Sequence, residues 1–286
     1  MEARATVIIP TFGRAQFARW AINSVQRQTV KDIEICILCD GSPESMVSFF
    51  DSFAKEDPRI RVFAFQKSPR TGEPYRDIAI KQTTGKIICY CCHDDLWLPN
   101  HVEEMEKTLA QHCFTNALFV LSKPTDSLKL KNLKGILADI QNPEIRNNIL
   151  NGQGNFGLTC GAHTRKSYLE LEEGWVTTPE GIPTDTFMWR KFISAYSNRC
   201  KTTMKVTAVS FPQTRRKSWS EQERDDELRR CFEKIQDGTL QRELADSYHV
   251  YKSAGDPATP LQTFSIRHYG FLQKFIFQHL SCRRQK

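Results

Sequence analysis

The stretch GKIICYCCHDDLWLP at residues 85–99 joins an apolar run to two adjacent carboxylates. Its first part, residues 86–92, has the length and composition of a strand that is covered on both faces of a parallel sheet. Asp94 and Asp95 follow directly, and such a pair is unfavourable beside a buried strand unless a cation or hydrogen bonds compensate it. A hard divalent ion is one solution. The other, commoner for an isolated pair, is a turn that caps the helix expected after Pro99.

Strand-like and helix-like segments alternate around this stretch. The alternation predicts right-handed crossovers and an α/β fold, a Rossmann-like and mainly parallel sheet flanked by helices. In such sheets ligands bind beyond the carboxyl ends of the strands, which selects the loops at 11–14, 40–43 and 93–97. The predicted strands lie at residues 6–10, 33–39, 60–65, 86–92 and 117–121, and the predicted helices at 16–28, 45–55, 75–83 and 100–111.

The second half of the chain is less regular. Residues 201–211 alternate like a sheet strand and offer Met204, Val206, Ala208 and Phe211 to the core. The other predicted segments are a polar excursion with a helix near its end (122–151), a strand (158–163) and helices at 184–195, 221–236, 239–254 and 261–280.

The composition is that of a folded protein: 286 residues, 40% hydrophobic and 26% charged, which excludes general disorder. Lys and Arg number 40 against 33 Asp and Glu, and the net charge of +7 suits anionic partners such as nucleotide phosphates, nucleic acid or acidic lipid. We find neither a signal peptide nor a run of about 20 apolar residues that could cross a bilayer. The ten cysteines therefore predict reduced thiols in a cytoplasmic protein.

Two groups of cysteines have spacings that zinc sites use. One is the Cys36-x-x-Cys39 pair, and the other is the cluster at residues 89–92 beside His93. Cys36 and Cys39 lie in an apolar strand, where side chains three residues apart point to opposite faces. We therefore expect small buried hydrophobic side chains here.

Together with two further motifs, the 85–99 stretch resembles the family 2 glycosyltransferases, which have the GT-A fold. The motifs are VIIPTFGR at 7–14 and DGS at 40–42, and the resemblance runs from about residue 6 to residue 192. It implies a metal-dependent, inverting, hexosyl-type transferase. Such an enzyme moves a sugar from a nucleoside diphosphate, most often UDP, to a hydroxyl of a glycan or lipid-linked acceptor, as in polysaccharide biosynthesis.

The resemblance also divides the chain. Residues 1–212 would form the GT-A domain, with a nucleotide-sugar half at about 1–121 and an acceptor half at about 152–212. Residues 213–286 would form a helical C-terminal extension. Its basic amphipathic stretch at 261–280 predicts either packing on its own domain or peripheral contact with an anionic membrane.

On the donor side, the resemblance assigns roles to several loop residues. Asp40 matches the aspartate that contacts uracil, Asp94 would contact ribose or the metal, and Asp95 would ligate Mn²⁺ or Mg²⁺ directly. This chain carries His93 where the family often has a third acidic residue. The other residues that the resemblance assigns to nucleotide binding are Pro10, Thr11, Phe12, Arg14, Arg76 and Asp77.

On the acceptor side, Asp185 matches the catalytic base of the family, while Thr184 stands where the family commonly has a second acid. The alternative is that Thr184 or Asp185 caps the helix that starts there. His163 and Trp175 lie in segments similar to the acceptor side. Arg215 and Arg216, after the last strand, are either diphosphate contacts or solvated basic surface.

Three other functions remain open at this point. A nucleotidyltransferase would share the sheet and the carboxylate-bound metal, but it normally has a Gly-rich basic loop after the first strand. A pseudoenzyme that binds nucleotide sugars would account for His93 and Thr184. A nucleic-acid-binding module is disfavoured, because the positive charge is dispersed and no nucleic-acid-binding motif is present.

Overall fold

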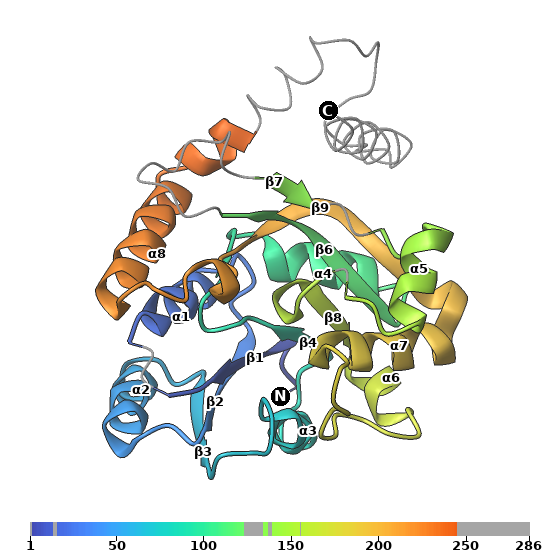
Figure 1. The fold of residues 1–286 in the computed structure, drawn as a ribbon, viewed down its shortest axis with the longest axis horizontal. Coiled ribbons are helices and arrows are strands. Elements are labelled where there is room, and N and C mark those ends of the chain that lie inside the picture. Colours follow the sequence, from blue (N-terminus) through green and yellow to red (C-terminus); the bar gives the residue numbers. More distant parts are fainter. Residues whose placement is uncertain (1, 14–15, 123–133, 137–138, 155, 245–286) are drawn as a thin grey trace, which may run out of the picture.

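The structure, a computed structural model, describes residues 2–13, 16–122, 134–136, 139–154 and 156–244. A nine-stranded sheet forms its centre, and helices surround the sheet (Figure 1). The strands are β1 (Ala5–Thr11), β2 (Ile33–Asp40), β3 (Ile60–Phe65), β4 (Ile87–Tyr90), β5 (Leu96–Trp97), β6 (Phe114–Leu121), β7 (Lys134–Ile136), β8 (Gly161–Thr164) and β9 (Cys200–Ser210). The helices are α1 (Ala18–Gln26), α2 (Glu44–Glu56), α3 (Glu73–Lys81), α4 (His101–Leu109), α5 (Pro143–Leu150), α6 (Arg165–Leu169), α7 (Thr184–Tyr196) and α8 (Glu221–Gln236).

The strand order is β3-β2-β1-β4-β8-β6-β9-β5, with β7 paired to β6. Strands β3, β2, β1 and β4 are parallel, as the alternation predicts. Beyond them the sheet is mixed, because β8 runs antiparallel between β4 and β6, while β9 is parallel to β6. The parallel half therefore brings the ends of β1, β2 and β4 to one edge, where a ligand site is expected.

In the first half of the chain every predicted helix and strand is present, and no end moves by more than three residues. The two-residue strand β5 in the first half was not predicted, and in the second half residues 158–160 form a single 3₁₀ turn before β8. On β9 the register with β6 shifts twice, and Met204 takes a positive φ of 58°. Met204 and Val206 are therefore only half-buried, whereas Ala208 and Phe211 lie in the core as predicted.

Strand β2 is covered on both faces. Cys36 and Cys39 have no exposed surface, and burial raises the pKa of the Cys36 thiol to about 12. The expectation that these cysteines pack as small hydrophobic side chains is confirmed. All cysteines within the described ranges are free thiols.

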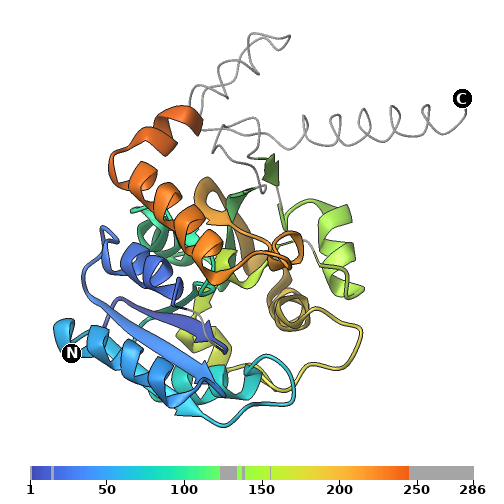
Figure 2. The ribbon, with the colours of Figure 1, turned by 60° about the vertical axis from the view of Figure 1, so that its left-hand side comes forward.

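Helix α8 lies along α1 in both views (Figures 1 and 2). The indole Nε1 of Trp20 donates to Asp225 at 2.9 Å, so the described part of the C-terminal extension is attached to the first helix. The predicted helix at 239–254 begins as expected, but its end and the stretch at 261–280 lie outside the described residues. No helix within the described ranges combines the length and apolar character that a membrane crossing requires.

Candidate functional site

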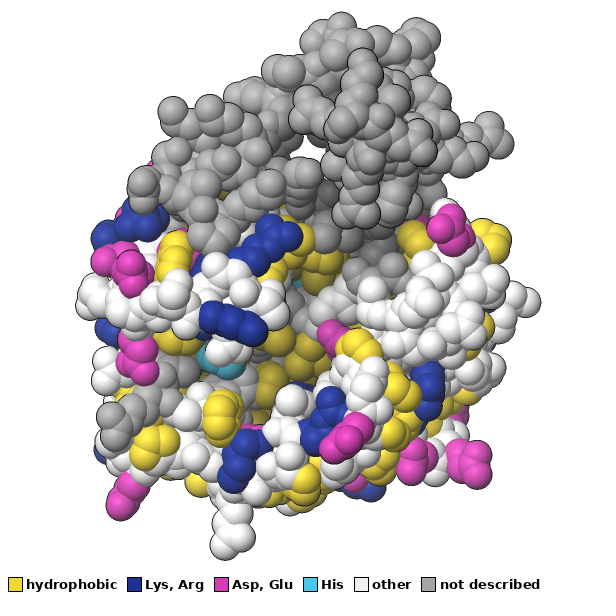
Figure 3. Space-filling model, in the orientation of Figure 1, with side chains coloured by type: hydrophobic (Ala, Val, Ile, Leu, Met, Phe, Trp, Pro, Cys, Tyr) yellow, Lys and Arg dark blue, Asp and Glu magenta, His cyan; other side chains and the backbone are white. Residues whose placement is uncertain are grey.

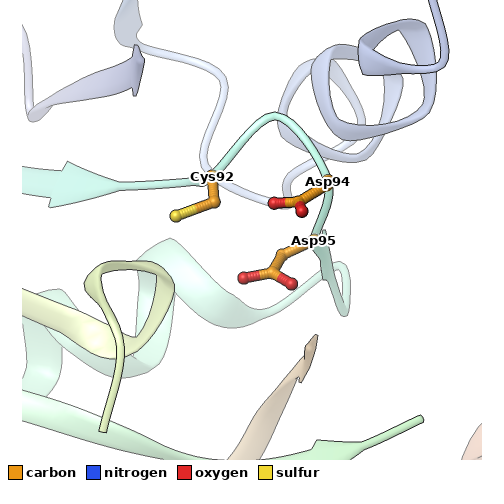
Figure 4. Close-up of side chains that lie close together, drawn as sticks. All are labelled: Cys92, Asp94 and Asp95. Carbon is orange, nitrogen blue, oxygen red and sulfur yellow. The ribbon is translucent and has the colours of Figure 1, made fainter. Parts of the chain in front are cut away.

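The loop after β4 forms a tight turn that gathers the two carboxylates and a thiol. The backbone N–H of Asp95 donates to the carbonyl of Cys92 at 3.1 Å, which closes the turn. As a result, Cys92, Asp94 and Asp95 bring one potential ligand atom each to within 4.8 Å of one another (Figure 4). The 85–99 stretch thus forms both a turn and a cluster of side chains that could hold a cation.

Asp95 is the more deeply buried of the two carboxylates. One oxygen accepts the N–H of Phe211 at 2.8 Å, and the other accepts the hydroxyl of Thr159. The Thr159 hydroxyl also accepts the N–H of Cys92 at 3.0 Å, so Asp95 connects the turn to the segments before β8 and after β9. Burial, and next the charge of Asp94, raise the pKa of Asp95 to about 7. This carboxylate therefore holds the loop in place and remains short of positive charge.

Asp94 is half-buried and takes its partner from the other end of the chain. Its Oδ2 accepts from the guanidinium of Arg224 on α8 at 2.9 Å, and that guanidinium also lies over the ring of Phe17, 4.6 Å from the centroid. Among the described residues no donor reaches the second oxygen of Asp94. Arg224 was not predicted, since nothing local marks a helical arginine as the partner of a loop 130 residues away.

His93 contacts the end of β1, unlike the two carboxylates that follow it. Its Nδ1 lies 3.3 Å from the carbonyl of Pro10 at the end of β1, and its ring stacks on Phe17 at 5.7 Å. His93 therefore connects the acidic loop to the first strand.

Asp40, at the end of β2, is held by the loop after β3. Its carboxylate accepts from the N–H of Ser68 at 2.6 Å, from the Ser68 hydroxyl at 3.0 Å and from the ammonium of Lys67 at 2.7 Å. The same ammonium lies 5.0 Å from the ring centre of Phe12, which is 57% exposed. Thr11 is buried and donates to the carbonyl of Leu38. An exposed aromatic ring beside a carboxylate and a cation is suited to a planar polar group such as a nucleotide base.

The structure separates Arg76 from Asp77, because adjacent residues on a helix point about 100° apart. Arg76 is buried, with its guanidinium 4.8 Å from the ring centre of Trp175, and burial lowers its pKa. Its Nη2 donates to the carbonyl of Thr71, but Nε and Nη1 have no partner among the described residues. Leaving donors of a buried guanidinium without partners is unfavourable, and an anionic group within reach would offset that cost.

Asp77 has both carboxylate oxygens occupied elsewhere. One accepts the hydroxyl of Tyr168 and the other binds Lys81, each at 2.7 Å. Asp77 therefore helps to pack α3 against Tyr168, and its predicted contact with the nucleotide stays a prediction.

Asp185 lies in the first turn of α7 and accepts the N–H of Thr186 at 2.8 Å. The cap position is Pro183, so neither Thr184 nor Asp185 is the N-cap, but Asp185 does occupy one free N–H of the first turn. Burial raises the pKa of Asp185, while the charge of Arg76 acts to lower it.

Asp185 and the acidic loop face the same region of the molecule. The 3₁₀ turn before β8 connects the two, because the hydroxyl of Thr159 donates to Asp95 and Oδ2 of Asp185 lies 3.7 Å from the position that a Cβ on Gly157 would take. Figure 3 shows this side of the molecule as a hollowed face, with hydrophobic side chains on its floor and basic side chains and a histidine along its edge.

His163 and Trp175 belong to the core. The hydroxyl of Tyr90 donates to His163 Nε2 at 2.7 Å and accepts the indole N–H of Trp175 at 2.9 Å. Burial lowers the pKa of His163 to about 3, so its ring is neutral. With exposures of 0% and 2%, the two side chains cannot line an open acceptor surface, and their predicted contact with an acceptor is corrected to a structural role.

The two arginines after β9 differ. Arg215 is exposed, whereas Arg216 is buried and forms a bidentate ion pair with Glu227 of α8. The Arg216 guanidinium also donates to the carbonyl of Ser122. Glu227 therefore compensates the charge of Arg216 inside the fold. This buried ion pair replaces the predicted contact of Arg216 with a diphosphate. Arg14 lies outside the described residues.

Comparison with known proteins gives a consistent result. An uncharacterized glycosyltransferase of Rickettsia bellii is 33% identical over 113 residues, which are 40% of this chain and 16% of that protein. A protein of Campylobacter jejuni named GalNAc(5)-diNAcBac-PP-undecaprenol beta-1,3-glucosyltransferase is 28% identical over 118 residues, which are 40% of this chain and 38% of that protein. The chain thus spans well under half the length of these curated relatives.

Solved structures share the fold. S. aureus TarS 1-349 in complex with UDP-GlcNAc matches with a TM-score of 0.56 at 14% identity, over 73% of this chain and 58% of that one. Mannosyltransferase PcManGT from Pyrobaculum calidifontis in complex with GDP-Man and Mn²⁺ matches with a TM-score of 0.51 at 16% identity, over 73% and 57%. The architecture is thus the predicted GT-A fold. The family model for "Glycosyl transferase family 2" matches residues 6–171, more than half of the 286 residues, and the chain therefore belongs to glycosyltransferase family 2.

Proposed function

We propose that this chain transfers a sugar from a nucleoside diphosphate, with UDP as the base of first choice, to a hydroxyl of a glycan or lipid-linked acceptor, with inversion at the anomeric carbon. The observation that carries the proposal is that the Asp94–Asp95 turn and the half-buried Asp185 both lie against residues 157–160. The complexes of the two solved structures, with UDP-GlcNAc and with GDP-Man, support a nucleotide-sugar donor.

The donor would lie along the carboxyl ends of the parallel strands. The exposed ring of Phe12 offers a face for the base, and Asp40 with Lys67 offers polar partners at its edge. The unpartnered Nε and Nη1 of Arg76 supply donors for an anionic or hydroxyl-rich part of the ligand.

The donor set of the turn fits a divalent cation. Asp94 has an oxygen that no described residue occupies, and the raised pKa of Asp95 shows that its charge is poorly compensated. These two residues would hold Mn²⁺ or Mg²⁺, which prefer carboxylate oxygens, with the Cys92 thiol beside them. When bound, such an ion neutralises charge on a diphosphate leaving group.

Asp185 would act as the general base. In the proposed step, the acceptor oxygen attacks the anomeric carbon, the bond from that carbon to the diphosphate oxygen breaks, and the acceptor proton moves to the Asp185 carboxylate. Burial makes this carboxylate a stronger base than an exposed aspartate, and the charge of Arg76 keeps it ionisable.

One observation favours a second candidate function, binding of nucleotide sugars without turnover. The guanidinium of Arg224 already occupies one side of Asp94, at 2.9 Å, where a cation would otherwise compensate the carboxylate. A turn stabilised in this way could bind a nucleotide without a metal ion.

A thermal-shift panel of UDP-, GDP- and dTDP-sugars with and without Mn²⁺ tests the proposal. A ligand at 100 times its Kd stabilises a protein by about 2.7 kcal/mol, which for a chain of this size raises Tm by about 5 °C. Donor consumption is then measured for each compound that binds. Binding without hydrolysis or transfer would favour the pseudoenzyme, and the absence of any shift across the panel would refute both functions.

A further inference from the structure

The segment that leads into α7, residues 176–183, is attached to the loop before α3 by a set of side-chain contacts. Arg70 makes the first of them. Its Nη1 donates to the carbonyls of Thr178, at 2.8 Å, and of Pro179, and its Nη2 donates to the carbonyl of Ile182 at 3.4 Å. One guanidinium thus contacts three carbonyls along the chain that precedes Asp185.

Glu73, the first residue of α3, makes the second set of contacts. Its side chain has no exposed surface. Oε1 accepts the N–H of Thr178 and the hydroxyl of Thr184, each at 3.3 Å, and Oε2 accepts the N–H of Thr71 at 2.9 Å. Burial alone would raise the pKa of Glu73, but hydrogen bonds from backbone N–H groups bring it below its ordinary value, so the carboxylate is charged.

These contacts matter because α7 has no side-chain cap of its own. The Glu73 carboxylate lies at the first residue of α3 and binds the hydroxyl of Thr184, the first residue of α7, so one negative charge serves the positive ends of both helices. Thr184 directly precedes Asp185. The acidic neighbour that Asp185 lacks in the sequence is therefore supplied in space, by Glu73.

We propose that Glu73, assisted by Arg70, is the positioning residue for Asp185: it holds residues 178–184 against α3 and so fixes where the Asp185 carboxylate points. This inference rests on the proposed function, in which Asp185 removes the acceptor proton. Glu73 acts through Thr178 and Thr184 and touches neither substrate.

The test compares Glu73→Gln with Glu44→Gln. Glu44 is the matched control, since it is likewise the first residue of a helix (α2) but is exposed. The glutamine side chain has one oxygen and one NH₂ group, and because the NH₂ group cannot accept, at least one of the three hydrogen bonds to Glu73 is lost. In the free protein, hydrogen–deuterium exchange of residues 176–186 is expected to quicken about tenfold or more in Glu73→Gln and to stay unchanged in Glu44→Gln.

The second measurement is turnover. We expect kcat for transfer to fall about tenfold in Glu73→Gln, with the acidic limb of its pH profile displaced and the Kd for the donor within about twofold of the wild type. Thr184→Ser should retain turnover, because it keeps the hydroxyl, and Thr184→Val should lose it as Glu73→Gln does. If Glu73→Gln does not fold, the comparison of Thr184→Ser with Thr184→Val tests the same contact.

The outcomes separate the two hypotheses. Unchanged exchange at residues 176–186 in Glu73→Gln, or unchanged kcat and pH profile in an active protein, overturns the positioning role. A wild type that consumes no donor with any acceptor refutes the proposed function, whereas the exchange experiment still reports on the Glu73 contacts by themselves.

Discussion

Replacing Arg216 by Met should destabilise the fold and leave the donor affinity of the folded protein unchanged. The Arg216 side chain has no exposed surface, and that of Glu227 is only 6% exposed. The substitution removes the partner of a buried carboxylate and also leaves the carbonyls of Ser122 and Pro212 without this donor. Breaking one side of a buried ion pair costs about 3–5 kcal/mol, which for a protein of this size lowers Tm by about 5–8 °C.

Thermal and urea unfolding measure this effect. Arg215→Met is the matched control, because that neighbouring side chain is exposed, and its Tm should change by about 1 °C at most. The double variant Arg216→Met/Glu227→Leu should recover most of the loss, since it removes both charges together. A normal Tm for Arg216→Met, combined with a tenfold or greater loss of donor affinity, would contradict the structural role and restore the predicted diphosphate contact.

The other predictions concern the site and the effect of pH. Asp185→Asn should reduce kcat about 10²–10⁴-fold while the donor Kd stays within about twofold; turnover within a few-fold of wild type would exclude the base role. Asp94→Asn should weaken Mn²⁺ binding, measured by calorimetry, and equal affinity in both proteins would contradict its place in the cation site. Burial lowers the pKa of both His101 and His163 to about 3. Because folded pKa values below the unfolded value of about 6.5 give stability that is present above pH 6.5 and lost towards pH 3, each histidine should reduce the unfolding free energy by about 2–3 kcal/mol between pH 6.5 and 4.5. Urea unfolding at the two pH values checks this, and a midpoint that does not move would contradict it.

The elements that the sequence predicts well are those whose signal is local. The apolar runs of β1, β2 and β4 define their own strands, and the parallel arrangement then brings the residues after them to one edge of the sheet. The turn at Asp94 and Asp95 is located correctly for the same reason. A strand of two residues such as β5 carries no such pattern and was not predicted.

What the sequence does not show is the choice of tertiary partners. Arg216 and Arg224 are both basic residues near the start of the extension, yet one pairs with Glu227 inside the fold and the other with Asp94 at the site. His163 and Trp175 lie in segments similar to an acceptor side, but the hydroxyl of Tyr90 holds both in the core. Such pairings depend on which surfaces meet, and neither periodicity nor local motif encodes that.

The bond between Arg224 and Asp94 has a practical consequence for cutting and recombining this chain. A shortened protein that ended at residue 212 would leave Asp94 without its guanidinium and would uncover Trp20 on α1 and Phe17, which directly precedes that helix. Chimaeras that replace the C-terminal region should therefore be joined after Gln236, where α8 ends. This chain then keeps the helix whose Arg224 binds Asp94.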